Sequence, residues 1–164
     1  MSDSVSALFL DHSTRKLSAM QEHLAGCLGR LNDEQIWEKH GPHENAIGNL
    51  VLHLCGNARQ WIMHGIAGVP DVRVRDAEFQ ATGGKTREEL LGLFAETMAE
   101  ARSVISSVAP ERLTQVIHPQ DIDVTVLEAI YQVVGHVQQH IGQIVVLTKQ
   151  MTGRDVDLVM PRAR

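Results

Sequence analysis

The chain has 164 residues, a length typical of one domain with a sizeable hydrophobic core. Hydrophobic residues make up 43% of it and charged residues 21%, an ordinary composition for a globular protein. The formal net charge is −5 and lysine and arginine form no cluster, so we expect neither nucleic acid nor an anionic membrane as a partner. We interpret residues 1–164 as a single domain.

The sequence contains no pattern typical of a secreted or membrane protein. The N-terminus lacks the basic and apolar regions of a signal peptide, and no apolar stretch approaches the roughly 20 residues needed to span a bilayer. Cys27 and Cys55 match no zinc-binding or redox spacing, and their apolar neighbours indicate buried free thiols. These features favour a cytoplasmic location.

The first half of the chain contains two segments with helical periodicity. The first runs from about Val5 to Leu31 and is followed by DEQIW, which is expected to form a short helical turn. The second is expected to begin after Asn45, acting as its N-cap, and to continue through AIGNLVLHLCGNARQWIMHGI. Residues 67–85 mix charge, glycine and proline without a clear period, so we interpret them as a long connection.

The second half contains two more helical segments, each with a start signal. Thr86 and Glu89 form a predicted capping box at the start of the third helix, which should end near residue 108. The connection PERLTQVIHPQDIDV follows and is expected to contain a little β-structure. Thr125 and Glu128 form the capping box of the fourth helix. Four long helices with two longer connections predict an all-α fold, a four-helix bundle.

Three of the nine histidines form a candidate metal site. His136 and His140 are four residues apart, which places both rings on one face of a helix, one turn apart. His53, between Leu52 and Leu54 in the second helix, is the best candidate for a third ligand. A divalent metal would satisfy several neutral imidazoles whose burial is otherwise costly. Three protein ligands would leave a position for water or substrate, as in catalytic zinc sites.

Simpler interpretations of these residues remain open. A histidine pair four residues apart often arises by chance, and a single histidine on an apolar helix is more often a core residue than a ligand. Val137 occupies the glutamate position of the His-Glu-x-x-His protease motif, so no general base is evident from spacing. Asn49, Asn57 and Gln143 flank the histidines and are candidate pocket residues, although polar contacts between helices would explain them equally well.

Two blocks, IGNLVLHLCGN and VVGHVQQHIGQIVVLTKQMTG, closely resemble the DinB-like (damage-inducible, YfiT-like) superfamily of metal-dependent proteins. The resemblance covers nearly the whole chain and includes an Arg-x-x-x-Phe element, here Arg75 and Phe79. It implies an up-down-down-up bundle with long connections, a homodimer, and a metal-binding triad of His53, His136 and His140. The implied metal is zinc or nickel, with iron as a further choice, and some relatives use a low-molecular-weight thiol for transfer or isomerisation.

These observations support three hypotheses about function. The first is a metal-dependent transferase or hydrolase, in which the metal lowers the pKa of a bound thiol or water for attack on a small electrophile. The second is a metal-binding or stress-response module without turnover. The third is a metal-free helical dimer with core histidines. Metal content and an accessible coordination position distinguish among them.

Overall fold

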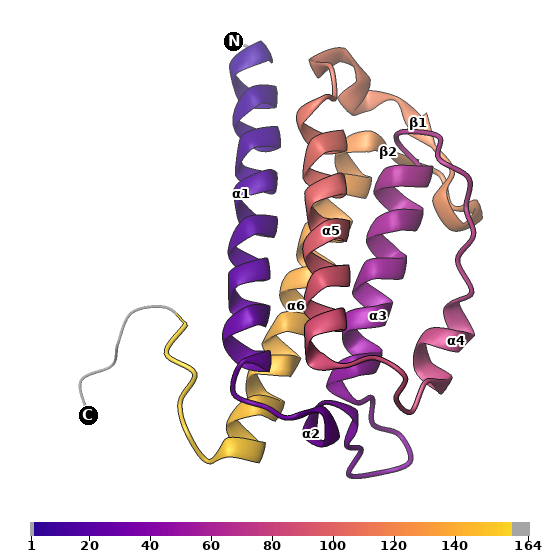
Figure 1. The fold of residues 1–164 in the computed structure, drawn as a ribbon. Helices are drawn as coiled ribbons and strands as arrows, with labels where there is room; N and C mark the ends of the chain where they lie inside the picture. The colour runs from indigo at the N-terminus through magenta and orange to yellow at the C-terminus, as the bar shows by residue number, and fades with distance from the viewer. Residues whose placement is uncertain (1, 159–164) are drawn as a thin grey trace.

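Four long helices form the body of the molecule (Figure 1), and the computed structural model describes residues 2–158. The bundle helices are α1 (Ser2–Leu28), α3 (Ile47–Ala58), α5 (Arg87–Ser106) and α6 (Val126–Thr152). α1 and α6 run in one direction and α3 and α5 in the other, which confirms the up-down-down-up bundle. α1 and α3 each pack against both α5 and α6, so α1 and α3 occupy opposite corners of the bundle.

Shorter elements connect and cover these helices. They are α2 (Asp33–Trp37), the π-helical turn η1 (Arg59–His64), α4 (Arg75–Gln80), the 3₁₀ turns η2 (Pro110–Thr114) and η3 (Pro119–Asp121), and strands β1 (Val116–Ile117) and β2 (Val124–Thr125). The two strands pair antiparallel, with Val116 opposite Thr125. Across residues 2–158, no helix combines the length and apolar character that crossing a membrane requires.

The core lies where the apolar stripes of the four long helices meet. Each stripe contributes aliphatic or aromatic side chains that are almost completely buried: Leu17 and Leu24 of α1, Leu54 of α3, Leu90, Phe94 and Met98 of α5, and Ile130, Val133 and Val137 of α6. Burying one such large side chain contributes roughly 1.5–3 kcal/mol. The stripes therefore supply the main driving force for assembly and fix which face of each helix points inward.

The capping signals correctly locate two of the helix starts. Thr86 accepts a hydrogen bond from the Glu89 N–H and begins α5, and Thr125 does the same for Glu128 in α6. The expected N-cap Asn45 is wrong, because α3 begins at Ile47 and Ala46 is its N-cap. The acceptor for the Ala46 N–H comes instead from inside the helix, from Asn49 Oδ1 at 3.0 Å.

Two further expectations need correction around α3. The predicted long second helix changes to π-helical geometry at Arg59–His64, where the Gly65 N–H bonds to the Gln60 carbonyl five residues earlier, at 3.1 Å. The region 67–85 is not wholly a connection, because residues 75–80 form α4. A six-residue helix is too short to be stable alone or to show a clear period, and α4 is held by its contacts with α3.

Truncating Phe94 tests the central role of the core. Phe94 is only 1% exposed on α5, so Phe94→Ala should lower the free energy of unfolding by about 3–5 kcal/mol through lost burial and a residual cavity. Chemical denaturation followed by circular dichroism measures this change. Glu96→Ala, on the exposed face of the same helix, should change the free energy by no more than about 0.5 kcal/mol.

Candidate metal centre

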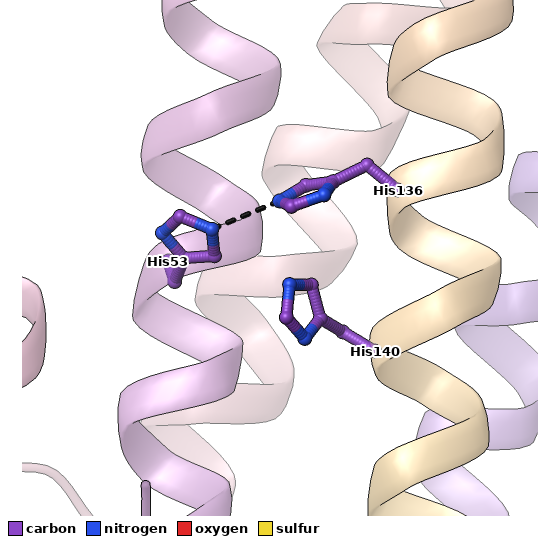
Figure 2. A group of neighbouring side chains, drawn as sticks. All are labelled: His53, His136 and His140. Atoms are coloured by element: carbon purple, nitrogen blue, oxygen red, sulfur yellow. Dashed lines mark hydrogen bonds between the residues drawn. The ribbon is translucent and has the colours of Figure 1, made fainter.

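The three histidines singled out from the sequence converge on one point between α3 and α6 (Figure 2). The potential ligand atoms of His53, His136 and His140 all lie within 4.8 Å of one another. The ring centroid of His53 lies 4.9 Å from that of His136 and 5.2 Å from that of His140. The centroids of the two α6 rings are 4.5 Å apart. His53 is buried, whereas the two α6 histidines are half-buried, so the cluster reaches the surface on the α6 side.

Helix geometry explains this convergence. α3 and α6 pack side by side in opposite directions, and the four-residue spacing puts His136 and His140 on successive turns facing α3. Val133, Val137 and Ile141 on α6 are buried in the core beside them, which fixes the rotation of this helix about its axis. The apolar core thus determines where the polar rings meet.

His53 is held from behind by an ion pair. Its Nδ1 lies 3.0 Å from Glu78 Oε2, and Glu78 receives hydrogen bonds from Arg73 Nε at 2.7 Å and Arg73 Nη2 at 2.8 Å. Burial alone would raise the pKa of the Glu78 carboxyl, but hydrogen bonds from Arg73 and His53 outweigh it and hold that pKa below its usual value. Glu78 is therefore a carboxylate, which accepts hydrogen bonds and donates none.

This carboxylate constrains the tautomer of the neutral His53 ring. Arg73 Nη2 also lies 3.1 Å from His53 Nδ1, but that donor already bonds to Glu78 Oε2. An unprotonated Nδ1 would place its lone pair against a carboxylate oxygen at 3.0 Å, which is repulsive. The Nδ1–H tautomer avoids this repulsion, and it leaves His53 Nε2 as the acceptor for a proton on His136 Nε2, 2.9 Å away.

The α6 histidines are kept neutral by their surroundings. Burial, followed by the neighbouring charges of His140, His53, Arg73 and Arg75, lowers the pKa of His136 to about 4. Burial likewise lowers the pKa of His140, partly opposed by the Gln143 side chain, whose Oε1 lies 2.7 Å from His140 Nδ1. When His140 Nδ1 donates its proton to Gln143 Oε1, the Nε2 of the neutral ring is unprotonated and points away from Gln143.

This donor set fits a divalent transition metal. Metals of this class bind neutral imidazole, and the carboxylate and amide partners at Nδ1 of His53 and His140 are the kind that orient metal-ligating rings. Nitrogens around a tetrahedral zinc lie about 3.3 Å apart, given metal–nitrogen distances of roughly 2.0–2.1 Å. The nitrogens here lie between 2.9 Å and 4.8 Å from one another, so small ring rotations suffice.

The three candidate pocket residues have different surroundings. Asn49 is buried, and its Nδ2 donates to the backbone carbonyls of Glu78 at 2.9 Å and Ala81 at 2.7 Å, so its amide anchors α4. Gln143 contacts His140 directly. Asn57 is buried one turn beyond His53, and its Oδ1 has no hydrogen-bond partner within the described part of the chain.

Sequence reasoning missed Glu78 and Arg73. They lie in the region interpreted as a connection, and their link to His53 exists only because the chain folds back along α3. The one available signal was that Glu78 directly precedes Phe79 of the Arg-x-x-x-Phe element. In the structure the Phe79 ring lies 4.8 Å from the His53 ring, and the Arg75 guanidinium lies 5.1 Å over Phe79.

A cavity lies near the cluster, although none of the three histidines lines it. Its volume is about 590 Å³, and Gln143, which contacts His140, forms part of its wall. Leu50 and Leu147 provide apolar surface, and His43, Glu44 and Gln139 provide polar groups. Such a mixed cavity has the size of a pocket for a small molecule.

Comparisons with known proteins agree with this fold. The model of the family described as "Protein of unknown function (DUF1572)" matches residues 4–164, so the chain belongs to this family. A conserved protein of Enterococcus faecalis has a similar structure, with 16% identity over 88% of this chain and 97% of its own and a TM-score of 0.72. No curated protein matches the chain.

Two further solved structures are of DinB-like proteins. One, from Bacillus cereus, is 17% identical over 95% of each chain, with a TM-score of 0.67. The other, YjoA from Bacillus subtilis, is 15% identical over 87% of this chain and 93% of its own, with a TM-score of 0.65. The resemblance to DinB-like proteins is thereby confirmed, and the fold is the DinB-like helical bundle.

The depressed pKa of His136 predicts how stability depends on pH. The metal-free folded protein resists protonating His136 until about pH 4, whereas the unfolded chain takes up that proton near 6.5. The contribution of His136 to the free energy of unfolding is therefore fully present above about pH 6.5, and it is lost as the pH drops toward 4. The loss should be on the order of 1 kcal/mol, because the ring is only half-buried and solvent screens it.

Urea denaturation of metal-free protein at several pH values measures this loss. His136→Gln should flatten the pH dependence, since it removes the titrating ring. His12→Gln, at an exposed position on α1, should leave it unchanged. Equal slopes for the wild type and His136→Gln would contradict the assignment.

Proposed function

We propose that His53, His136 and His140 bind one divalent metal ion and that the protein is a metal-dependent enzyme acting on a small molecule. The observation that carries this proposal is the convergence of three imidazoles, with ligand atoms within 4.8 Å, at the half-exposed edge of a packed helical interface. Zinc or nickel, and iron after them, suit neutral nitrogen ligands. Three protein ligands leave room for an exogenous ligand, as in catalytic zinc sites.

The proposed reaction is thiol-dependent S-transfer or isomerisation of a small electrophile. When bound, the metal would lower the pKa of a coordinated thiol or water and so supply a nucleophile near neutral pH. The protein's own groups prepare the site: Glu78 and Gln143 fix the orientation of two of the three rings. The cavity whose wall includes Gln143 offers apolar and polar walls for the thiol or the electrophile. Resemblance to DinB-like proteins supports a cytoplasmic homodimer as the working form.

A non-catalytic metal-binding or stress-response module is the second candidate. It is favoured by the surroundings of Glu78, the buried carboxylate next to the cluster. Both oxygens of Glu78 are engaged by Arg73 and His53, so this group is not free to act as a general base. A reaction at this site would therefore depend on a nucleophile that needs no protein carboxylate, such as a metal-activated thiol.

Metal analysis tests the first part of the proposal. Untagged protein should contain or take up about one zinc or nickel ion per chain, as expected for one three-ligand site. Binding should also raise the midpoint of thermal unfolding, because the metal binds the folded state. His140→Ala should abolish both effects, whereas His12→Ala, at an exposed position far from the cluster in sequence, should preserve them. Wild-type protein with no stoichiometric metal and no stabilisation by zinc, nickel or iron would refute metal binding.

A thiol screen tests the second part. Metal-loaded protein should accelerate the reaction of a low-molecular-weight thiol with a generic electrophile such as a chloronitrobenzene. Removing the metal with a chelator, or substituting His140→Ala, should reduce the rate to the uncatalysed background. Turnover that persists after metal removal would contradict this mechanism. Metal binding without turnover for any thiol tested would favour the non-catalytic module.

A further inference from the structure

The segment that contains α4 contacts His53 on the side opposite the other two histidines. Arg73 and Glu78 lie on this segment, and their side chains are only 4% and 10% exposed. Burying an ion pair is costly, so a pair in this position needs more than Coulomb attraction to be favourable. Here each charged group finds several partners, and one of those partners is a ring of the candidate metal centre.

The hydrogen bonds form a chain that ends at the cluster. Arg73 binds both oxygens of the Glu78 carboxylate, and the oxygen nearer His53 accepts the Nδ1 proton. Arg73 Nη1 is fixed in turn by Gln60 Oε1 at 2.9 Å, at the π-helical turn. The guanidinium therefore has little freedom, and it fixes the carboxylate that fixes the ring.

The surface of α3 is shaped to admit this ion pair. Gly56 lies three residues after His53, on the same side of the helix. A methyl group there would lie 1.9 Å from Glu78 Oε1 and 2.8 Å from Arg73 Nε, so the ion pair would have to move. A glycine is therefore needed for the pair to reach His53.

Two other contacts hold α4 in register with His53. The Phe79 ring lies against the His53 ring, with 4.8 Å between centroids. Asn49, one turn before His53, donates to the carbonyls of Glu78 and Ala81 at the end of α4. α4 thus supplies both the acceptor for Nδ1, from Glu78, and the surface for the ring, from Phe79. Asn49 of α3 anchors α4 in place.

We propose that Glu78 and Arg73 are positioning residues that hold His53 as the Nδ1–H tautomer, with Nε2 directed at His136 and His140. The metal part of this inference rests on the proposed function, and the tautomer part does not. A carboxylate in this position orients the ring and increases the basicity of the ligating nitrogen. α4 is then part of the metal site, although it contributes no ligand.

A purely structural role of the ion pair makes a different prediction. In that case the pair only fastens α4 to α3, and its loss lowers stability without changing the proton on His53 or the affinity for metal. The opposite tautomer, with Arg73 donating to a bare Nδ1 over their 3.1 Å separation, would place a proton on Nε2 and block it as a ligand. Nitrogen NMR distinguishes these arrangements.

The first experiment uses the wild-type protein without metal. Long-range ¹H–¹⁵N correlation spectra of histidine-labelled protein, assigned with His53→Gln, report which ring nitrogen carries the proton. We expect His53 to be protonated at Nδ1 at neutral pH. A His53 protonated at Nε2 would overturn the proposal. This result is independent of metal binding, so it stands or fails separately from the proposed function.

The second experiment compares zinc affinity among variants by competition with a chromophoric chelator. Glu78→Gln should weaken binding roughly 10–100-fold, the range typical of lost outer-shell partners. Gly56→Ala keeps every hydrogen-bonding group but displaces the pair, and it should weaken binding in the same direction. Glu100→Gln is the matched control, because Glu100 is exposed and lines a second cavity, of about 580 Å³, whose wall also includes Arg73 and Glu78.

Glu78→Asp separates positioning from folding. The shorter carboxylate keeps the charge, so it should recover part of the zinc affinity lost in Glu78→Gln, and part of the Nδ1–H population. Circular dichroism of each variant checks that the helices are intact. Wild-type zinc affinity in folded Glu78→Gln would overturn the metal part of the inference, as would an equal loss in Glu100→Gln.

Discussion

The packing of α3 against α6 is the interaction on which the rest of the site depends. Apolar side chains on both helices fix how each is rotated about its axis, and this rotation turns three imidazoles toward one another. Packed interiors tolerate little displacement, so the relative position of the rings is set by the core. Helix packing therefore sets where the candidate site lies, and local hydrogen bonds set how its rings are oriented.

That local detail comes from groups that would each be costly to bury alone. A carboxylate, a guanidinium and three imidazoles lie together at one helical interface, and each compensates for the desolvation of another. The Glu78 charge keeps the Nδ1 proton on His53, while burial keeps His136 neutral. In the metal-free protein the 2.9 Å contact between His53 Nε2 and His136 Nε2 is a hydrogen bond, and a metal bound by both nitrogens would replace its proton.

The long connections of the fold support the histidine cluster. Between α3 and α5, the chain crosses back over α3 instead of taking the shortest route, and this crossing brings α4 behind His53. The π-helical turn at the end of α3 places Gln60 where it can bind Arg73. A segment without helical period in the sequence thus becomes the support of a buried ring, which is a common role for loops on a rigid scaffold.

The sequence by itself determined the four long helices, two of their caps and the three histidines, because helical periodicity, capping boxes and i, i+4 spacing are local properties of the chain. Only the tertiary structure decided that His53 meets His136 across 83 positions, and that Glu78 and Arg73 stand behind it. These contacts join segments with no shared period, so they follow from how helices pack and not from any local pattern.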